Sequence, residues 1–215
     1  MNLSEAEVNM SRDRVEFFYD LSSPWTYLAY TNLQGVLARA GATARLRPIL
    51  VGGVFNAVNQ SVYAAREDAD NRKMKNSWRG LKDWAAFTGV TLRFPSQYHP
   101  AKSVNAMRMA CSLAEDVAAL NSFTKAAFES YFGREENLDD PDTLVAVANA
   151  AGLDGEAMRV AAQTDAVKML LRANTEEVIA RGGYGSPTIF VDTTKMYFGN
   201  DQLPLVEFVL KDKPA

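Results

Sequence analysis

The chain has 215 residues, which suits one domain or one domain with a large insertion, and its formal net charge of −3 is close to balance. Lysine and arginine are scattered rather than clustered, so no basic patch favours nucleic acid as a partner. No stretch approaches the roughly 20 apolar residues of a membrane-spanning helix, and the acidic, polar N-terminus differs from a signal peptide, so we expect a cytoplasmic protein that does not insert into membranes.

The sequence offers few residues for redox or metal chemistry. Cys111 is the only cysteine and His99 the only histidine. One thiol excludes an internal disulfide and a Cys-x-x-Cys pair, and one imidazole leaves few parts for a zinc site or a serine-histidine triad. We therefore expect no metal site, a buried and unreactive Cys111, and a structural His99, although the segment around His99 could border a cleft.

The N-terminal part of the chain predicts a βαβ unit. Residues 1–13 are charged and without period, as in a frayed leader, and residues 14–20 have the composition of a strand. Pro24 suits the first position of a helix, and Gly41 ends the helical spacing of apolar residues. Residues 43–51 then predict a second strand, parallel to the first.

The middle of the chain predicts a block of helices. From Gly52 to Gln60 the sequence is polar and turn-prone, and between residues 64 and 89 aromatic and leucine residues have helical spacing. Residues 91–100 contain two prolines and predict an irregular segment. Five helices are predicted next, over residues 103–120, 122–132, 141–151, 155–163 and 164–181.

The C-terminal part predicts a ββα unit. Strands are expected over residues 189–192 and 196–199, joined by a turn, and a last helix over residues 201–210. The order βαβ, helical block, ββα is the thioredoxin-like arrangement of an α/β fold with a large inserted all-helical domain. We expect residues 14–52 and 182–215 to form the thioredoxin-like domain, and residues 53–181 to form the insertion.

The predicted helix start at Ser23 is the first candidate site. The first turn of a helix has unpaired N–H groups and the positive end of the helix dipole, which favours anions. The segment from Ser22 to Thr26 stands where a thioredoxin-like protein has Cys-x-x-Cys, with hydroxyls at Ser23 and Thr26 in place of thiols. A hydroxyl cannot exchange disulfides, but it can donate a hydrogen bond to a thiolate that a cofactor brings. A simple helix cap is the alternative.

Two further segments could complete a ligand site. In a thioredoxin-like frame the Ser186–Pro187 bond is cis and Ser186 exposes its backbone to an extended cysteinyl ligand, whereas an ordinary trans turn is the default for a proline. Asn200 or Asp201 either caps the last helix or, in the case of Asp201, holds an ammonium group such as that of the glutamyl end of glutathione.

Four motifs carry a family resemblance. The segments FFYDLSSPWTYLAY, RPILVGGVF, GSPT and FGNDQL occur in this order with a helical block between them. Together they resemble the 2-hydroxychromene-2-carboxylate isomerase family and its kappa-class glutathione transferase relatives, within the DsbA-like thioredoxin superfamily. The resemblance covers about residues 14–210.

The resemblance implies a glutathione-dependent enzyme and assigns its contacts. Ser23 matches the family serine beside the glutathione sulfur, and Ser186 and Pro187 match the turn that pairs with the cysteinyl backbone. Asn200 and Asp201 match the positions that hold the glutamyl end. The resemblance also implies a homodimer.

Further matches and departures leave parts of this interpretation open. Asn59 or Gln60 falls in a loop where the family has a glycine-asparagine pair that contacts glutathione, but the prolines usual after the asparagine are missing. Ser22 and Ser186 stand where the family usually has hydrophobic residues, so either Ser22 or Ser23 can face the sulfur.

The resemblance implies reversible addition of the glutathione thiolate to an aromatic-degradation intermediate, bond rotation and expulsion of glutathione, with isomerisation as the net change. A kappa-class-like transferase and a non-catalytic thioredoxin-like protein that binds thiols or peptides are the alternatives. A small aromatic or electrophilic substrate is expected, in an apolar pocket that Tyr19, Trp25 and Phe55 could line, whereas Trp78 and Trp84 are expected to pack between helices.

Overall fold

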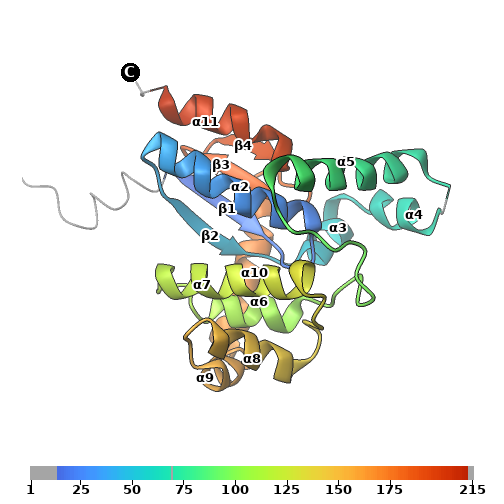
Figure 1. The fold of residues 1–215 in the computed structure, drawn as a ribbon. Helices are drawn as coiled ribbons and strands as arrows, with labels where there is room; N and C mark the ends of the chain where they lie inside the picture. The colour runs from blue at the N-terminus through green and yellow to red at the C-terminus, as the bar shows by residue number, and fades with distance from the viewer. Residues whose placement is uncertain (1–13, 69, 213–215) are drawn as a thin grey trace, which may run out of the picture.

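The computed structural model describes residues 14–68 and 70–212 and has a mixed four-stranded sheet in the order β2-β1-β3-β4 (Figure 1). Strand β1 (Val15–Tyr19) pairs in parallel with β2 (Ala44–Pro48) and antiparallel with β3 (Thr188–Val191), which in turn pairs antiparallel with β4 (Lys195–Phe198). The predicted α/β fold of thioredoxin-like type is therefore confirmed. The predicted leader, residues 1–13, lies outside the described residues.

The central strand β1 is buried on both faces, which explains its run of aromatic residues. Phe17 and Tyr19 point into the large core, and Phe18 points into a smaller cluster on the other face of the sheet. Strand β2 is shorter than the predicted 43–51. Pro48 is its last residue, and the next helix begins at Val51.

Helix α2 (Pro24–Ala40) follows β1 directly and ends at Gly41, whose φ of 63° lies in the left-handed region that glycine tolerates. Helix α11 (Leu203–Lys211) lies beside α2, after a short 3-10 turn (Asn200–Gln202). Both predicted helices are confirmed in place, although α11 begins two residues later than predicted.

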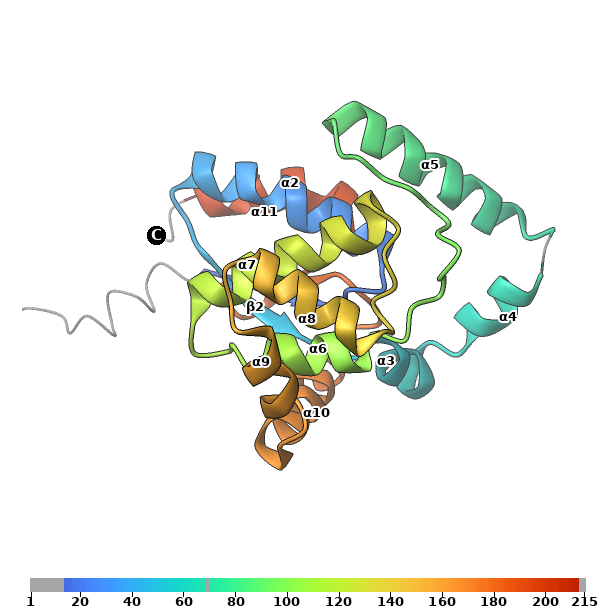
Figure 2. The same cartoon turned by 60° about the horizontal axis from the view of Figure 1, so that its bottom comes forward.

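Of the remaining helices, α3 and α10 pack on the face of the sheet that carries Phe18, whereas α6 and α7 contribute to the large core on the face of Phe17 and Tyr19 (Figures 1 and 2). Their bounds are α3 (Val51–Val58), α4 (Ser61–Glu67), α5 (Arg72–Thr88), α6 (Val104–Cys111), α7 (Val117–Phe128), α8 (Pro141–Ala150), α9 (Gly155–Ala161) and α10 (Asp165–Ala180), with a π-helical turn (Glu129–Gly133) after α7. Helices α6 to α9 lie together below the sheet in Figure 1, and α4 and α5 extend to one side.

Two predictions in this helical block are wrong. The segment predicted as polar and turn-prone, residues 52–60, is mostly helix α3, which buries Val51 and Val54. Gly53 lets α3 lie close to α10, since a Cβ added there would lie 3.2 Å from Cγ2 of Thr175. The predicted helix 103–120 is broken between α6 and α7. Asp116 begins the second helix by accepting the N–H of Ala119 at 2.9 Å.

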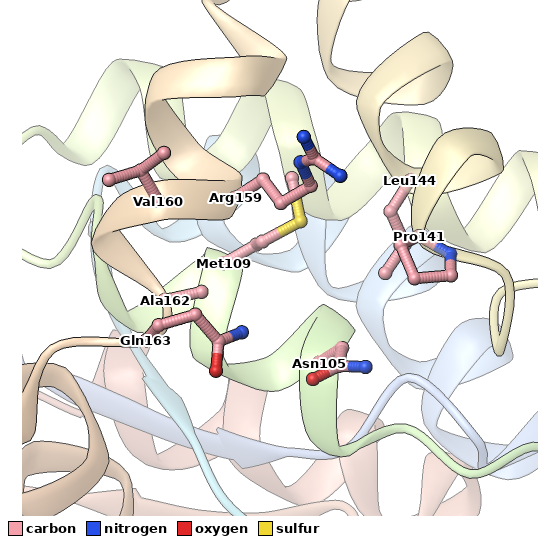
Figure 3. A pocket seen from close by; sticks show the side chains of 8 residues that line it. All are labelled: Asn105, Met109, Pro141, Leu144, Arg159, Val160, Ala162 and Gln163. Atoms are coloured by element: carbon pink, nitrogen blue, oxygen red, sulfur yellow. The ribbon is translucent and has the colours of Figure 1, made fainter.

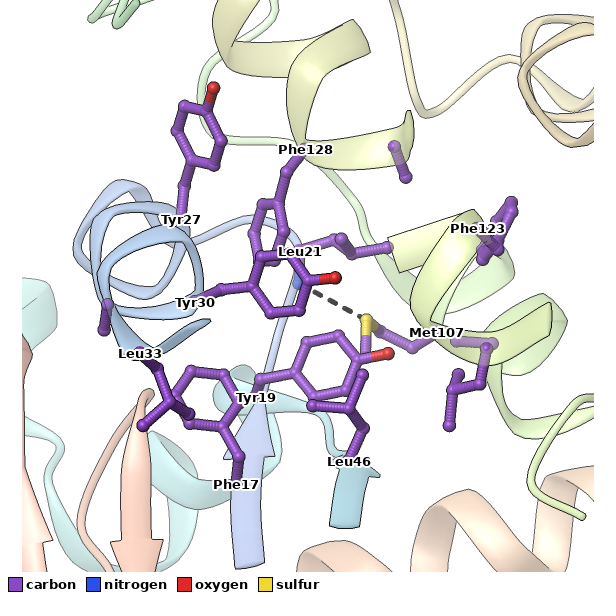
Figure 4. Packing of buried hydrophobic residues seen from close by; sticks show 14 of the residues in the cluster. Phe17, Tyr19, Leu21, Tyr27, Tyr30, Leu33, Leu46, Met107, Phe123 and Phe128 are labelled. Carbon is purple, nitrogen blue, oxygen red and sulfur yellow. Dashed lines mark hydrogen bonds between the residues drawn. The ribbon is translucent and has the colours of Figure 1, made fainter. Parts of the chain in front are cut away.

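The core joins the sheet to the helical block (Figure 4). Phe128 of α7 packs against the rings of Tyr27 and Tyr30 of α2, both at 5.5 Å between ring centroids. The N–H of Leu21 points at Sδ of Met107 at 3.3 Å, the contact drawn dashed in Figure 4. One hydrophobic cluster therefore spans both predicted parts of the chain, and their division into two domains stays a prediction. Within the described residues, no helix has the length and apolar character needed to cross a membrane.

The core predicts a large stability difference between two phenylalanines. Phe128→Ala removes a fully buried ring, so we expect the free energy of unfolding to fall by about 3–5 kcal/mol in urea titrations. Phe87→Ala is the matched control, because this ring is 82% exposed and its loss should change stability by about 0.5 kcal/mol or less. Equal effects of the two substitutions would contradict a core centred on α2 and α7.

Candidate functional site

Four segments meet where β1 ends: the residue after the strand, the start of α2, the start of α3 and the turn before β3. Ligand sites in α/β folds gather at such strand ends, where helices begin. Asp20 follows β1 and is 1% exposed. Its carboxylate accepts hydrogen bonds from the N–H and Oγ of Ser22, both at 2.9 Å, and from the N–H of Val51 at 2.8 Å. The carboxylate thus joins the starts of α2 and α3 to the strand.

Ser23 is the N-cap of α2. Its Oγ accepts the N–H of Thr26 at 3.2 Å and donates to the carbonyl oxygen of Ser186, also at 3.2 Å. Ser23 therefore caps the helix, and the cap leaves the hydroxyl proton directed at the turn before β3. A group at this place meets the free N–H groups and the positive dipole end of a 17-residue helix.

The turn before β3 has the geometry that the thioredoxin-like frame predicts. The Ser186–Pro187 peptide bond is cis, as expected. The Ser186 side chain points inward: its Oγ accepts the N–H of Asp20 at 2.8 Å and shares a hydrogen bond of 2.7 Å with Oγ1 of Thr26. These bonds fix the position of the Ser186 backbone relative to Ser23.

A cavity of about 390 Å³ opens beside these residues. Ser22, Ser23 and Ser186 give it a polar end, and its apolar walls include Trp25, Phe55 and Trp78. Trp25 and Phe55 were predicted to line such a pocket, whereas Trp78 was expected to pack between helices and instead lines the cavity.

Tyr19 was also predicted to line the pocket, and this is wrong. The ring is fully buried in the core, and its hydroxyl is paired with Oγ1 of Thr124 at 2.7 Å. Burial raises the pKa of this phenol well above its ordinary value. The alternation of β1 directs Tyr19 to the same face as Phe17, away from the site.

The other predicted ligand residues lie at different depths. Asn59 lines the cavity and donates to the carbonyl of Tyr184 at 3.1 Å, whereas Gln60 bonds the carbonyl of Asn56 on the surface. Asn200 is 1% exposed and accepts a bond of 2.8 Å from Nδ2 of Asn32.

Asp201 is exposed, and neither Asn200 nor Asp201 is among the residues that line the cavity. The alternative in which one of them caps the last helix is wrong, because α11 begins at Leu203 without a side-chain cap. The part of Asn200 and Asp201 in ligand binding stays a prediction.

Two residues near the cavity were not proposed from the sequence as site residues. Asp20 directly follows an apolar strand, and this position at a strand end could have identified it as a site residue from the sequence. His99 lines the cavity with its ring 4.7 Å from that of Phe94. The prediction that its segment could border a cleft is therefore confirmed.

Two other candidate features lie away from this cavity. Cys111 is 2% exposed, and burial raises the pKa of its thiol to about 12. A cavity of about 330 Å³ lies between α6, α8 and α9, with Met109, Leu144 and Val160 in its largely apolar lining (Figure 3). It has no serine or threonine hydroxyl in its lining and faces none of the predicted residues, so we place the candidate chemistry at the start of α2.

Comparison with known proteins agrees with the observed fold. The family model of the DSBA-like thioredoxin domain matches residues 14–211. The chain is 27% identical over 204 residues to a 2-hydroxychromene-2-carboxylate isomerase of Sphingobium xenophagum, covering 92% of this chain and 98% of that protein. It is 24% identical over 210 residues to glutathione S-transferase kappa 1 of Homo sapiens, covering 93% and 91%.

Solved structures share the fold. A 2-hydroxychromene-2-carboxylate isomerase structure superposes with a TM-score of 0.76 at 24% identity, covering 91% of this chain and 93% of that chain. A probable DsbA oxidoreductase from Streptomyces coelicolor gives a TM-score of 0.71 at 20% identity, covering 92% and 88%.

The Ser186 hydroxyl predicts a stability effect that surface serines lack. Ser186→Ala leaves the buried N–H of Asp20 without its acceptor, so the free energy of unfolding should fall by about 1–3 kcal/mol. Ser61→Ala is the control, because the Ser61 hydroxyl bonds Asn59 on the surface. A Ser186→Ala protein as stable as the control in urea titrations would show that these bonds contribute little.

Cys111 predicts an inert thiol. With its pKa near 12, the thiol is protonated at pH 8, and its burial blocks access. Native protein should therefore react with an aromatic disulfide reagent at least about a hundredfold more slowly than protein unfolded in urea. Comparable rates in the two states would contradict this assignment.

Proposed function

The chain belongs to the DSBA-like thioredoxin domain family, and from this premise we propose that it is a glutathione-dependent isomerase of the 2-hydroxychromene-2-carboxylate isomerase type. The observation that carries the proposal is the Ser23 hydroxyl at the start of α2, 3.2 Å from the Ser186 carbonyl at the polar end of a cavity. The names of relatives at 27% and 24% identity support the same assignment.

The site needs a thiol from a ligand. A dithiol oxidoreductase requires a reactive cysteine pair, and the chain has only Cys111, which lies in the core. Ser23 occupies the place of the reactive cysteine with a group that can donate a hydrogen bond. The residues present therefore fit a bound thiol compound and do not fit thiol exchange between two protein cysteines.

Ser23 and the start of α2 favour the ionised form of such a thiol. The unpaired N–H groups of the first helical turn and the helix dipole attract negative charge and lower the pKa of a thiol placed there. The Ser23 proton is held by a neutral carbonyl at 3.2 Å, and a thiolate is a stronger acceptor. Ser23 can thus turn its proton to the sulfur without losing the helix cap at Thr26.

The turn at Ser186 would hold the backbone of the ligand. Its side-chain bonds to Asp20 and Thr26 fix its carbonyl beside Ser23. An extended cysteinyl residue can pair with this backbone like an added strand, which places its side chain toward the start of α2. Asn59 lines the same cavity, and Asn200 and Asp201 would hold the glutamyl end.

Bound glutathione would supply a nucleophile that adds reversibly to a conjugated double bond, so that the bond can rotate before the double bond forms again. The chain's own contribution is to orient the sulfur, to stabilise its charge at Ser23 and to exclude water with the aromatic walls at Trp25, Phe55 and Trp78. An aromatic-degradation intermediate fits walls of this kind.

Two alternatives use the same site. A kappa-class-like transferase would differ in releasing the glutathione adduct as product, and the relatives of that name support it. A non-catalytic thiol- or peptide-binding protein would bind glutathione but turn over neither a hydroxychromene carboxylate nor chlorodinitrobenzene.

Cytoplasmic location and a homodimer belong to this proposal as well, and sedimentation would test the dimer.

Calorimetry with glutathione tests the role of Ser23. Wild-type protein should bind glutathione, and Ser23→Ala should bind it about 10–100-fold more weakly, because a charge-assisted hydrogen bond to the sulfur is lost. Ser23→Thr keeps the hydroxyl and should retain most of the affinity. S-methylglutathione has no thiolate, so its affinity should be nearly the same for wild type and Ser23→Ala.

Two outcomes would contradict this proposal. Absence of binding to wild-type protein at millimolar glutathione would exclude the cofactor. Equal binding of glutathione by wild type and Ser23→Ala would exclude Ser23 as the group that contacts the sulfur.

A further inference from the structure

The hydroxyl of Ser22 is fixed as a hydrogen-bond acceptor. Both oxygens of Asp20 receive backbone N–H groups, from Ser22 and Val51, which is the pattern of an ionised carboxylate. An ionised carboxylate can only accept, so the Ser22 hydroxyl must donate its single proton to Asp20 across the 2.9 Å bond. Only the lone pairs of the Ser22 oxygen remain for other groups.

The neighbouring Ser23 has the opposite polarity. Its oxygen already accepts the N–H of Thr26, and its proton points to the weakly bound carbonyl of Ser186. A thiolate next to Ser23 meets a donor, whereas a thiolate next to Ser22 meets lone pairs with the Asp20 charge behind them. The hydrogen bonds therefore assign the sulfur to Ser23 and leave Ser22 for another group.

Ser22 lies between two cavities. It lines the cavity that contains Ser23 and also a second cavity of about 280 Å³. The second cavity is also lined by Asp20, Tyr63 and Lys102, and it shares Ser22, Val51, Phe55 and His99 with the first. The Ser22 oxygen is thus one of the groups that a molecule in the second cavity would meet when its reactive carbon approaches a sulfur held at Ser23.

We propose that Asp20 is a positioning residue: it fixes Ser22 as an acceptor between the two cavities, and so selects electrophiles that have a hydroxyl or N–H donor next to the carbon that the thiolate attacks. This inference rests on the proposed function, because it takes the sulfur of glutathione to lie at Ser23. A substrate with such a donor completes the bonding of Ser22. A substrate without such a donor leaves the Ser22 oxygen without a hydrogen bond, or places its own lone pairs against those of Ser22.

Conjugate addition to matched enals measures this selection. The substrates are a γ-hydroxy enal, its methyl ether and the parent enal without the oxygen. In each case the sulfur–carbon bond forms at the β carbon, the double bond becomes single and the α carbon takes a proton from solvent. Rates are expressed as kcat/KM divided by the uncatalysed rate constant with glutathione, which removes the intrinsic reactivity of each enal.

Wild-type protein should prefer the γ-hydroxy enal to both others by about tenfold or more. Ser22→Ala keeps the backbone bonds to Asp20 and should lose this preference, whereas Ser22→Thr keeps the hydroxyl and should retain it. Asp20→Asn should reduce the preference, because the Ser22 proton is no longer held by a charge. A merely structural Asp20 would change stability and leave the ratio of substrates unchanged.

Glutathione calorimetry on the same variants separates the two proposals. Wild-type protein that binds glutathione and adds it to all three enals equally would overturn the role of Asp20 and Ser22 while leaving the proposed function intact. A preference for the γ-hydroxy enal that persists in Ser22→Ala would likewise overturn the role of Asp20 and Ser22. Wild-type protein that binds no glutathione would overturn both.

Discussion

The buried carboxylate of Asp20 is the constraint on which the site depends. A charged group out of contact with water is costly unless hydrogen bonds replace its hydration. Asp20 obtains them from the N–H of Ser22, the hydroxyl of Ser22 and the N–H of Val51. Because these donors belong to the starts of α2 and α3, satisfying the carboxylate fixes the end of β1 and both helix starts in one arrangement.

This arrangement also sets the electrostatics of the cavity. The start of α2 attracts negative charge, while the Asp20 carboxylate lies a few residues before it and opposes such charge. The directions of the two serine hydroxyl protons decide which of these two charges a ligand meets. Ser22 directs its proton inward to Asp20, and Ser23 has a proton that can turn to a ligand. Ser22 therefore offers a ligand a hydrogen-bond acceptor, whereas the adjacent Ser23 offers it a donor.

The sequence predicts the fold to the extent that local pattern decides it. Strand β1, helix α2 with its end at Gly41, and the β3–β4 hairpin follow from composition, caps and turns, and the structure has them. Helix α3 was missed, because Gly52-Gly53 is a local turn signal, whereas the contacts of α3 with α10 involve residues more than 100 positions away in the sequence. Depth in the core, which removed Tyr19 from the site and turned Asn200 toward Asn32, is likewise set by distant parts of the chain.

The two polar departures from the family motif belong to one network. Ser22 and Ser186 stand where the family that this sequence resembles usually has hydrophobic residues. Neither departure, taken alone, shows which serine faces a ligand. In the structure both side chains bond to Asp20, Ser22 through its carboxylate and Ser186 through its N–H. Ser186 reaches Thr26 as well, which ties the turn to α2. A hydrophobic side chain at 186 alone would leave the N–H of Asp20 without this acceptor, so the departure at 186 is part of how this chain satisfies the residue that orients Ser22.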